Sequence, residues 1–244
     1  RNIPIVTKNL LIVNVVAFLA CMLKVVYDGK VLIKLLRISV WSMLHSFVSV
    51  APWFLFFVAI EHLGRTELAI SNITRSISTV FFVIVNSFAS TTGSLVSNLI
   101  GAGQGKELFP VCHKVLRLGY AVGGPLIVMA LWGNQWVIGF YTNNDYLVKL
   151  AFWPFIVMLL NYVFALPGYV YINAGTGTGK TKLAFIFQLI TILVYLIYLY
   201  LLSECFHASL TVYMTAEYLF VILLGIQSIL YLKRKSKQNM YFCT

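Results

Sequence analysis

Residues 183–202 read LAFIFQLITILVYLIYLYLL, a stretch of twenty residues without a charged side chain. As an α-helix, twenty residues extend for about 30 Å, which is the thickness of the hydrocarbon core of a bilayer. A helix also satisfies its own backbone hydrogen bonds, as any segment in lipid must. The stretch therefore predicts a transmembrane helix.

Six further apolar stretches repeat this pattern along the chain. The composition agrees with them: 60% of the residues are hydrophobic, 10% are charged and the mean hydropathy is +0.89. An ordinary soluble domain has about 25% charged residues, so this class is excluded. We expect an all-α membrane protein with about seven transmembrane helices, near Asn9–Tyr27, Ser39–Ile60, Leu68–Ile100, Leu116–Trp132, Leu147–Ile172, Leu183–Leu202 and Leu210–Leu232.

The basic residues give the chain a formal charge of +11. They lie between apolar stretches and not on one polar domain, so we expect no nucleic-acid partner. Thirteen of the eighteen follow the first, third, fifth or seventh stretch. By the positive-inside rule the N-terminus of this chain is outside and the C-terminus is cytoplasmic. Seven spans with this orientation fit either a seven-helix receptor or a larger transporter without its N-terminal half.

The third stretch carries polar residues at helical spacing, which a lipid-facing helix would not. Either they line a water-filled cavity, or they allow close contact with another helix. The stripe consists of Asn72, Ser76, Thr79, Asn86, Ser90 and Ser97.

Arg75 in the third stretch is the only basic residue well inside an apolar span, and Glu217 in the seventh is the only acidic one. Each lies near the outer end of its stretch, so their depths are similar. Because a charge at membrane depth is costly, the two residues are candidates for an ion pair or for ion coupling. The alternative for Arg75 is that its side chain extends to the outer interface.

The glycine-rich segment Ala174–Thr181 matches a relaxed phosphate-loop pattern. A true phosphate loop joins a strand to a helix, whereas this segment joins two predicted transmembrane helices. We therefore expect a tight turn that needs glycine φ angles. The cysteines have no metal-ligand spacing, and no triad of hydrolytic residues is evident, so we expect no metal site, cofactor or enzymatic activity.

Four segments resemble multidrug and toxic compound extrusion (MATE) transporters. Glu61–Ile73 is similar to the link between their seventh and eighth helices, and Leu95–Glu107 to the end of the eighth helix and the loop after it. Phe140–Asp145 resembles the turn before the tenth helix, and Asn173–Thr181 the glycine-rich turn after it. The order and spacing fit over about 200 residues.

This resemblance implies a twelve-helix transporter with two six-helix lobes, of which the chain covers the sixth helix and the C-terminal lobe. Residues 1–38 would then form one transmembrane helix and a basic linker, residues 39–232 the lobe, and residues 233–244 a basic cytoplasmic tail. The implied activity is export of organic, often cationic, compounds driven by entry of Na⁺ or H⁺. We expect a bacterial inner membrane as the location, and the lipid bilayer and a missing N-terminal lobe as partners.

The resemblance also implies a substrate cavity between the lobes. We expect this lobe to contribute Ser49, Asn72, Ser76, Thr79, Asn86, Ser90 and Asn161. Many family members carry a membrane-embedded acid near the position of Ser49, and this chain has none there. The acid that couples ion entry to export would then be Glu217 or would lie in the absent N-terminal lobe. A flippase for lipids or polymer precursors, which would have a more cationic cavity, and a receptor remain as alternatives.

Overall fold

The computed structural model describes residues 29–142, 144–205 and 208–237. These residues form helices joined by short turns and include no strand, which confirms the all-α fold class. The chain divides into two compact units, residues 1–43 and 44–244. Helix α2 (Gly29–Glu61) begins in the first unit, and all later helices belong to the second.

Six of the predicted transmembrane helices lie in the described residues, and all six are present there. The predicted helix Asn9–Tyr27 lies outside the described residues. In chain order the helices after α2 are α3 (Arg65–Gly101), η1 (Gly105–Glu107), α4 (Leu108–Trp132), α5 (Asn134–Gly139), α6 (Asp145–Leu160), α7 (Tyr162–Gly177), α8 (Thr181–Tyr200), η2 (Leu201–Cys205), α9 (Leu210–Tyr213) and α10 (Ala216–Lys237).

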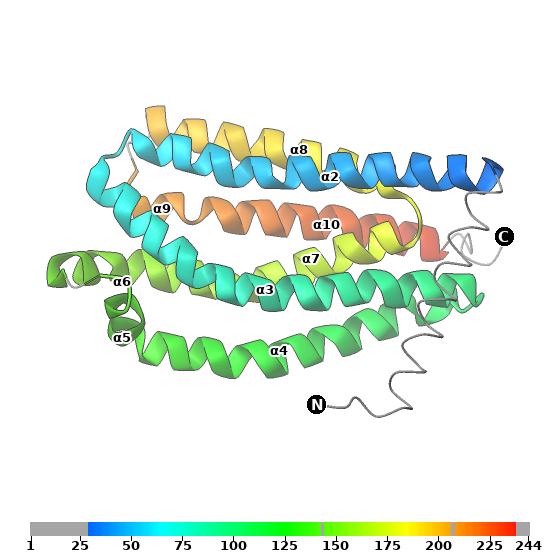
Figure 1. Ribbon diagram of the computed structural model, residues 1–244, viewed down its shortest axis with the longest axis horizontal. Coiled ribbons are helices and arrows are strands. Elements are labelled where there is room, and N and C mark those ends of the chain that lie inside the picture. Colours follow the sequence, from blue (N-terminus) through cyan, green and yellow to red (C-terminus); the bar gives the residue numbers. More distant parts are fainter. Residues whose placement is uncertain (1–28, 143, 206–207, 238–244) are drawn as a thin grey trace, which may run out of the picture. The chain divides into compact units, whose positions relative to one another are not determined.

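Helix α4 begins eight residues before its predicted start at Leu116. Its first turns bury Leu108, Cys112 and Val115 on one face, whereas Lys114 on another face is exposed. This amphipathic pattern lowers the hydropathy of the segment without ending the helix. The short apolar patch after α4 forms the separate helix α5, which turns away from the axis of α4 in Figure 1.

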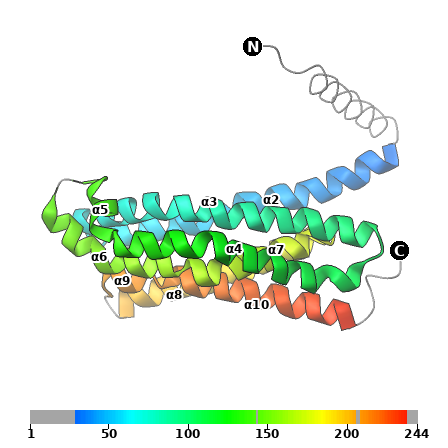
Figure 2. The same cartoon turned by 90° about the horizontal axis from the view of Figure 1, so that it is seen from below.

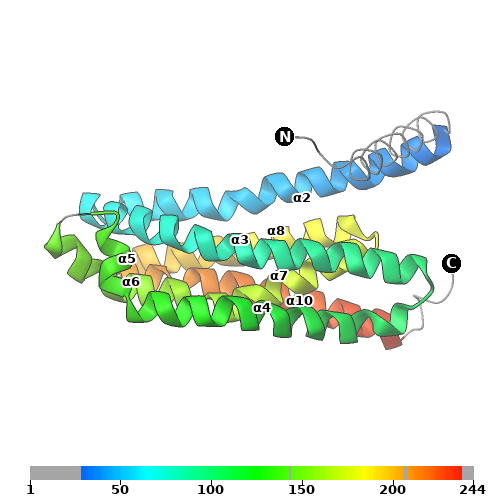
Figure 3. The ribbon, with the colours of Figure 1, turned by 60° about the horizontal axis from the view of Figure 1, so that its bottom comes forward.

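Helix α7 lies at the centre of the second unit, where it packs against α3, α4, α8 and α10. Helix α4 runs back alongside α3 (Figures 1 and 2), and α10 runs alongside α8. Figure 3 shows α7 between α3 and α10. The core is therefore built around one central helix.

Small residues allow the close approach of α7 to its neighbours. A Cβ atom added at Gly168 of α7 would lie 2.7 Å from the carbonyl oxygen of Val221 on α10. A Cβ atom at Gly177, near the end of α7, would lie 2.5 Å from the carbonyl oxygen of Gly93 on α3. Glycines at such contacts let transmembrane backbones pack directly against one another.

The glycine-rich segment after α7 forms a turn. Gly179 has φ +78°, a conformation that side chains other than that of glycine rarely adopt. Thr178 and Gly179 donate backbone hydrogen bonds to the carbonyls of Gly175 and Thr176, which close the end of α7. Helices precede and follow this turn, so the segment lacks the strand that a phosphate loop requires.

Candidate functional site

The ion pair of Arg75 and Glu217 lies inside the helix bundle. Arg75 Nη2 donates a hydrogen bond of 2.6 Å to Glu217 Oε1. The side chains of Arg75 and Glu217 are only 3% and 10% exposed, so the Arg75 side chain does not extend to the surface. The Tyr195 hydroxyl from α8 donates a longer bond of 3.4 Å to the same carboxylate oxygen. Three helices thus meet at one buried carboxylate.

Aromatic rings from α2 surround the other side of the guanidinium. Arg75 Cζ lies 3.9 Å from the ring centroid of Phe56, 4.9 Å from Trp53 and 5.2 Å from Phe57. Arg75 Nε and Nη1 have no hydrogen-bond acceptor in the described residues. Aromatic faces attract a cation most strongly where water is excluded, so these rings stabilise the buried charge.

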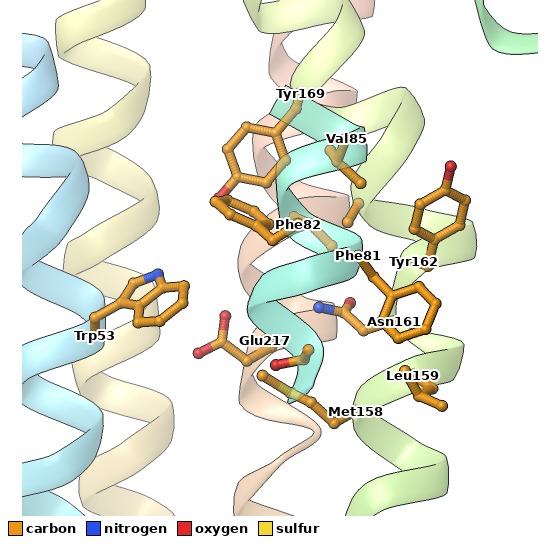
Figure 4. Close-up of a pocket in the computed structure, with 13 residues that line it drawn as sticks. Trp53, Phe81, Phe82, Val85, Met158, Leu159, Asn161, Tyr162, Tyr169 and Glu217 are labelled. Atoms are coloured by element: carbon orange, nitrogen blue, oxygen red, sulfur yellow. The ribbon is translucent and has the colours of Figure 1, made fainter. Parts of the chain in front are cut away.

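A pocket of about 520 Å³, its open side included, lies beside this pair. Glu217 is the one charged side chain among its lining residues in the described structure. In the view of Figure 4 the Glu217 carboxylate lies between Trp53 and Asn161. Helices α2, α3, α6, α7 and α10 and the residue between α6 and α7 contribute to the wall, which consists of Trp53, Ser78, Phe81, Phe82, Val85, Met158, Leu159, Asn161, Tyr162, Ala165, Tyr169, Glu217 and Val221.

The aromatic part of this wall is continuous. The ring of Phe82 lies 5.9 Å from that of Trp53 and 5.1 Å from that of Tyr169, in an edge-to-face arrangement with the latter. Such pairs add to the energy of packing and hold the rings in place. The pocket therefore offers a continuous aromatic wall next to a carboxylate.

Close packing against α4 positions Tyr162 at the edge of the pocket. Its hydroxyl donates a 2.8 Å hydrogen bond to the carbonyl of Gly119. A Cβ atom at Gly123 would lie 2.0 Å from the Tyr162 hydroxyl oxygen, so only glycine leaves room for this ring. The small residues of α4 thus decide where a pocket residue on α7 can lie.

Asn161 and Glu217 are the sequence-predicted site residues that the structure brings to the pocket. Asn161 separates α6 from α7, is buried, and has no hydrogen-bond donor at its Oδ1 atom among the described residues. Ser49 is half-buried on α2 and donates a hydrogen bond to the Ser46 carbonyl.

The polar stripe of α3 lies outside the pocket. All its residues are exposed, and two of them, Ser76 and Thr79, donate hydrogen bonds to carbonyl groups of α3 itself. The stripe therefore makes no polar contact with another helix through these two hydroxyls, and it lies on an exposed face of α3. The face of α3 that lines the pocket instead carries Ser78, Phe82 and Val85.

Trp53, Phe56 and Phe82 are site residues that the sequence did not single out. In the sequence they are ordinary members of aromatic, apolar stretches. Phe56 could have been predicted from Arg75. A buried charge is costly unless neighbouring side chains stabilise it, so residues on adjacent helices were candidates for that contact. No group of three or more metal-ligand side chains occurs in the part of the chain that the structure describes.

Comparison with known proteins agrees with this architecture. The sequence matches the MatE family over residues 42–201, which is more than half of the chain. The chain belongs to the MatE family. This match confirms the resemblance noted in the sequence. Members of the family are membrane transporters and not enzymes. Together with the six apolar helices, membership shows that this is a multi-pass membrane protein.

This MatE chain is similar to a protein matched by sequence and to transporters of solved structure. The protein named Uncharacterized transporter C4B3.13 of Schizosaccharomyces pombe is 31% identical over 100 residues, which are 41% of this chain and 19% of that protein. The Vibrio cholerae MATE transporter VcmN in the bent form is 17% identical, with a TM-score of 0.71 over 86% of this chain and 47% of that one. A MOP superfamily transporter from Pyrococcus furiosus is 15% identical, with a TM-score of 0.68 over 83% and 44%.

These structural likenesses concern the fold. The chain spans less than half the length of the solved transporters that it matches. Which part of such a transporter the chain corresponds to stays a prediction from the sequence.

Proposed function

We propose that this chain forms the C-terminal lobe of a secondary-active exporter of organic cations, coupled to entry of Na⁺ or H⁺. The observation that supports the proposal most directly is the pocket, in which aromatic rings adjoin the carboxylate of Glu217. A flat organic cation can stack on Phe82 or on Trp53 while its charge faces the carboxylate. The unpartnered Asn161 Oδ1 offers a further hydrogen-bond acceptor.

The charge of the pocket favours this substrate class over the anionic lipids or polymer precursors of a flippase. A phosphate group requires cationic donors, and the charged lining side chain is here an acid. Arg75 lies close by, but its Nη2 donates to Glu217 and its remaining face is covered by aromatic rings. A seven-helix receptor is disfavoured because the chain belongs to a transporter family.

Competition for one carboxylate would couple the substrate to the ion. Arg75 is the cation that Glu217 binds in this structure. A substrate cation, Na⁺ or H⁺ that reaches Glu217 would each replace this interaction, so only one of them can be bound there at a time. Mutually exclusive binding makes entry of the ion favour release of the substrate, which is the requirement for antiport.

The test is gradient-driven transport by the full-length protein in proteoliposomes. We expect ethidium, an aromatic cation, to be transported against its gradient when a Na⁺ or pH gradient is imposed, and an anionic dye such as carboxyfluorescein not to be. Glu217→Gln should abolish transport. Glu204→Gln, which removes an exposed carboxylate of η2 just after α8, is the matched control and should retain transport.

A second variant covers the case that Glu217→Gln fails to fold. Phe82→Leu leaves the ion pair intact and removes an aromatic face from the pocket. We expect it to raise the KM for ethidium without lowering the amount of folded protein. Transport of the anionic dye in preference to ethidium, or an unchanged KM in Phe82→Leu, would overturn the proposal.

A further inference from the structure

A second, larger cavity lies between α8 and α10, away from the pocket of Glu217. It is a groove of about 1290 Å³, open side included. Its apolar walls are formed by Leu183 and Phe187 of α8 and by Leu230 and Tyr231 of α10. The rings of Phe187 and Tyr231 meet edge to face with their centroids 6.0 Å apart. Nothing in the proposed transport cycle uses this groove.

One end of the groove is basic. Lys233 and Arg234 line it, both are exposed, and no ion pair is recorded for either in the described residues. Residues 218–244 include no Asp or Glu, so no acid of that segment can neutralise them. The groove therefore combines an apolar channel with two cationic groups at its end.

A smaller cavity of about 200 Å³ shares Leu183, Phe187 and Tyr231 with the groove. It extends to Lys180, in the turn between α7 and α8. Three cationic side chains from two segments thus lie at the same end of α8 and α10. These segments are separated by more than fifty residues in the sequence, and the fold brings them together.

The dimensions of the groove suit a lipid. Its lining along α10 extends from Gln227 to Arg234, about 10 Å of helix. This is about two thirds of the thickness of one leaflet of a hydrocarbon core. An acyl chain can follow the apolar wall while the lipid phosphate lies at the level of Lys233 and Arg234. Basic pockets between transmembrane helices are sites at which anionic headgroups bind.

We propose that this groove is a binding site for an anionic phospholipid, with the acyl chain against Phe187 and Leu230 and the phosphate at Lys233 and Arg234. A zwitterionic lipid has the same chains and a net charge of zero, so it gains less from the two cations. Free phosphate has the charge but no chain, so it cannot use the apolar wall. Both parts of the ligand are needed for tight binding.

Native mass spectrometry of the full-length protein, titrated with phosphatidylglycerol or phosphatidylcholine, tests the site. We expect tighter retention of phosphatidylglycerol. Lys233→Gln with Arg234→Gln should weaken this binding about 30-fold, from the loss of two basic groups near the headgroup. Both side chains are exposed at a helix end, so the variant should fold, which size-exclusion chromatography checks.

Two controls separate binding in this groove from non-specific electrostatic attraction between anionic lipids and the basic surface of the protein. Lys114→Gln with Arg117→Gln removes two exposed charges from α4, outside the groove, and should change lipid binding less than about threefold. Leu230→Trp fills the groove without changing its charge and should weaken binding of both lipids. Equal retention of the two lipids, an equal loss in the α4 control, or displacement of phosphatidylglycerol by millimolar inorganic phosphate would overturn the proposal.

Discussion

Arg75 Nη2 and Glu217 Oε1 lie 2.6 Å apart and join two helices that both pack on α7. Arg75 belongs to α3 and Glu217 to the first turn of α10, where the N-terminus of the helix also favours a negative charge. The ion pair therefore links the two sides of the bundle across its central helix.

Removal of either charge should destabilise the folded protein. Glu217→Gln leaves a guanidinium buried without its counter-ion, and Arg75→Met leaves a buried carboxylate. Breaking a buried pair on one side costs about 3–5 kcal/mol. We expect both variants to melt at lower temperature than the wild type, as measured by the loss of the monodisperse peak of the full-length protein on heating in detergent.

The double variant Arg75→Met, Glu217→Leu is the control for this prediction. It removes both charges, so no unpaired ion remains, and apolar replacement of a buried pair is often neutral. Its melting temperature should lie above those of both single variants. The charge reversal Arg75→Glu, Glu217→Arg should not recover stability, because it places a carboxylate against the face of Phe56. Full recovery in the reversed pair would show that the aromatic rings contribute nothing.

The contact of Phe56 with Arg75 should be measurable by itself. Phe56→Leu removes the ring that lies 3.9 Å from the guanidinium carbon. In the Arg75→Met, Glu217→Leu variant, which has neither charge, the same substitution removes packing only. The difference between the stability lost in the wild type and in this variant therefore measures the attraction between the ring and the guanidinium. We expect a coupling energy of about 1–2 kcal/mol. Phe54→Leu, on an exposed face of α2, should show no coupling to Arg75.

The helices could be predicted from the sequence because apolar stretches of membrane-spanning length are a direct signal. Six of them lie in the described residues and are present there, although α2 begins ten residues before the predicted Ser39 and α4 eight residues before the predicted Leu116. Asn161 and Glu217 could be predicted as candidates because a polar side chain in an apolar span stands out. Trp53 and Phe82 were not, since an aromatic residue in such a span is ordinary, and only the order of the helices brings them to one pocket.

The approach of α7 to α10 should depend on Gly168. An added methyl group would lie 2.7 Å from a backbone carbonyl oxygen, which cannot move aside as a side chain can. We expect Gly168→Ala to destabilise the protein by about 1–3 kcal/mol, the usual cost of overpacking. Gly124→Ala on α4, where no atom lies within 4 Å of the added Cβ, is the matched control and should leave the melting temperature unchanged or higher.

The orientation of the chain stays a prediction of the positive-inside rule. Tyr146, at the start of α6, should be outside, and Ser236, near the end of α10, should be cytoplasmic. Single cysteines at these positions, in a variant without other cysteines, should differ in reaction with a membrane-impermeant maleimide on intact cells. Tyr146→Cys should be labelled and Ser236→Cys should be labelled only after lysis. The reverse pattern would mean that the basic loops are outside.

The polar stripe of α3 should face water in the full-length protein. Its residues are exposed, and the hydroxyls of Ser76 and Thr79 donate to carbonyl groups of α3 itself, so no other helix in the described part of the chain accepts from them. Cysteines at Ser76, Thr79, Asn86 and Ser90 should therefore react with a small, water-soluble thiol reagent. A bound aromatic cation should protect them if the space in front of the stripe belongs to the substrate path.

A residue that is exposed in the structure can face either water or lipid. The control for the stripe must therefore be an equally exposed residue that we expect to face lipid. Leu193 on α8 is 60% exposed and lies on an apolar helix surface, where we expect lipid. Leu193→Cys should not react with the water-soluble reagent, because the thiolate that reacts does not form in hydrocarbon. Val96→Cys, on the buried face of α3 and outside the pocket, should not react either. If the stripe reacts no faster than Leu193→Cys, it faces lipid or a dry helix contact, and its serines and threonines serve close packing instead.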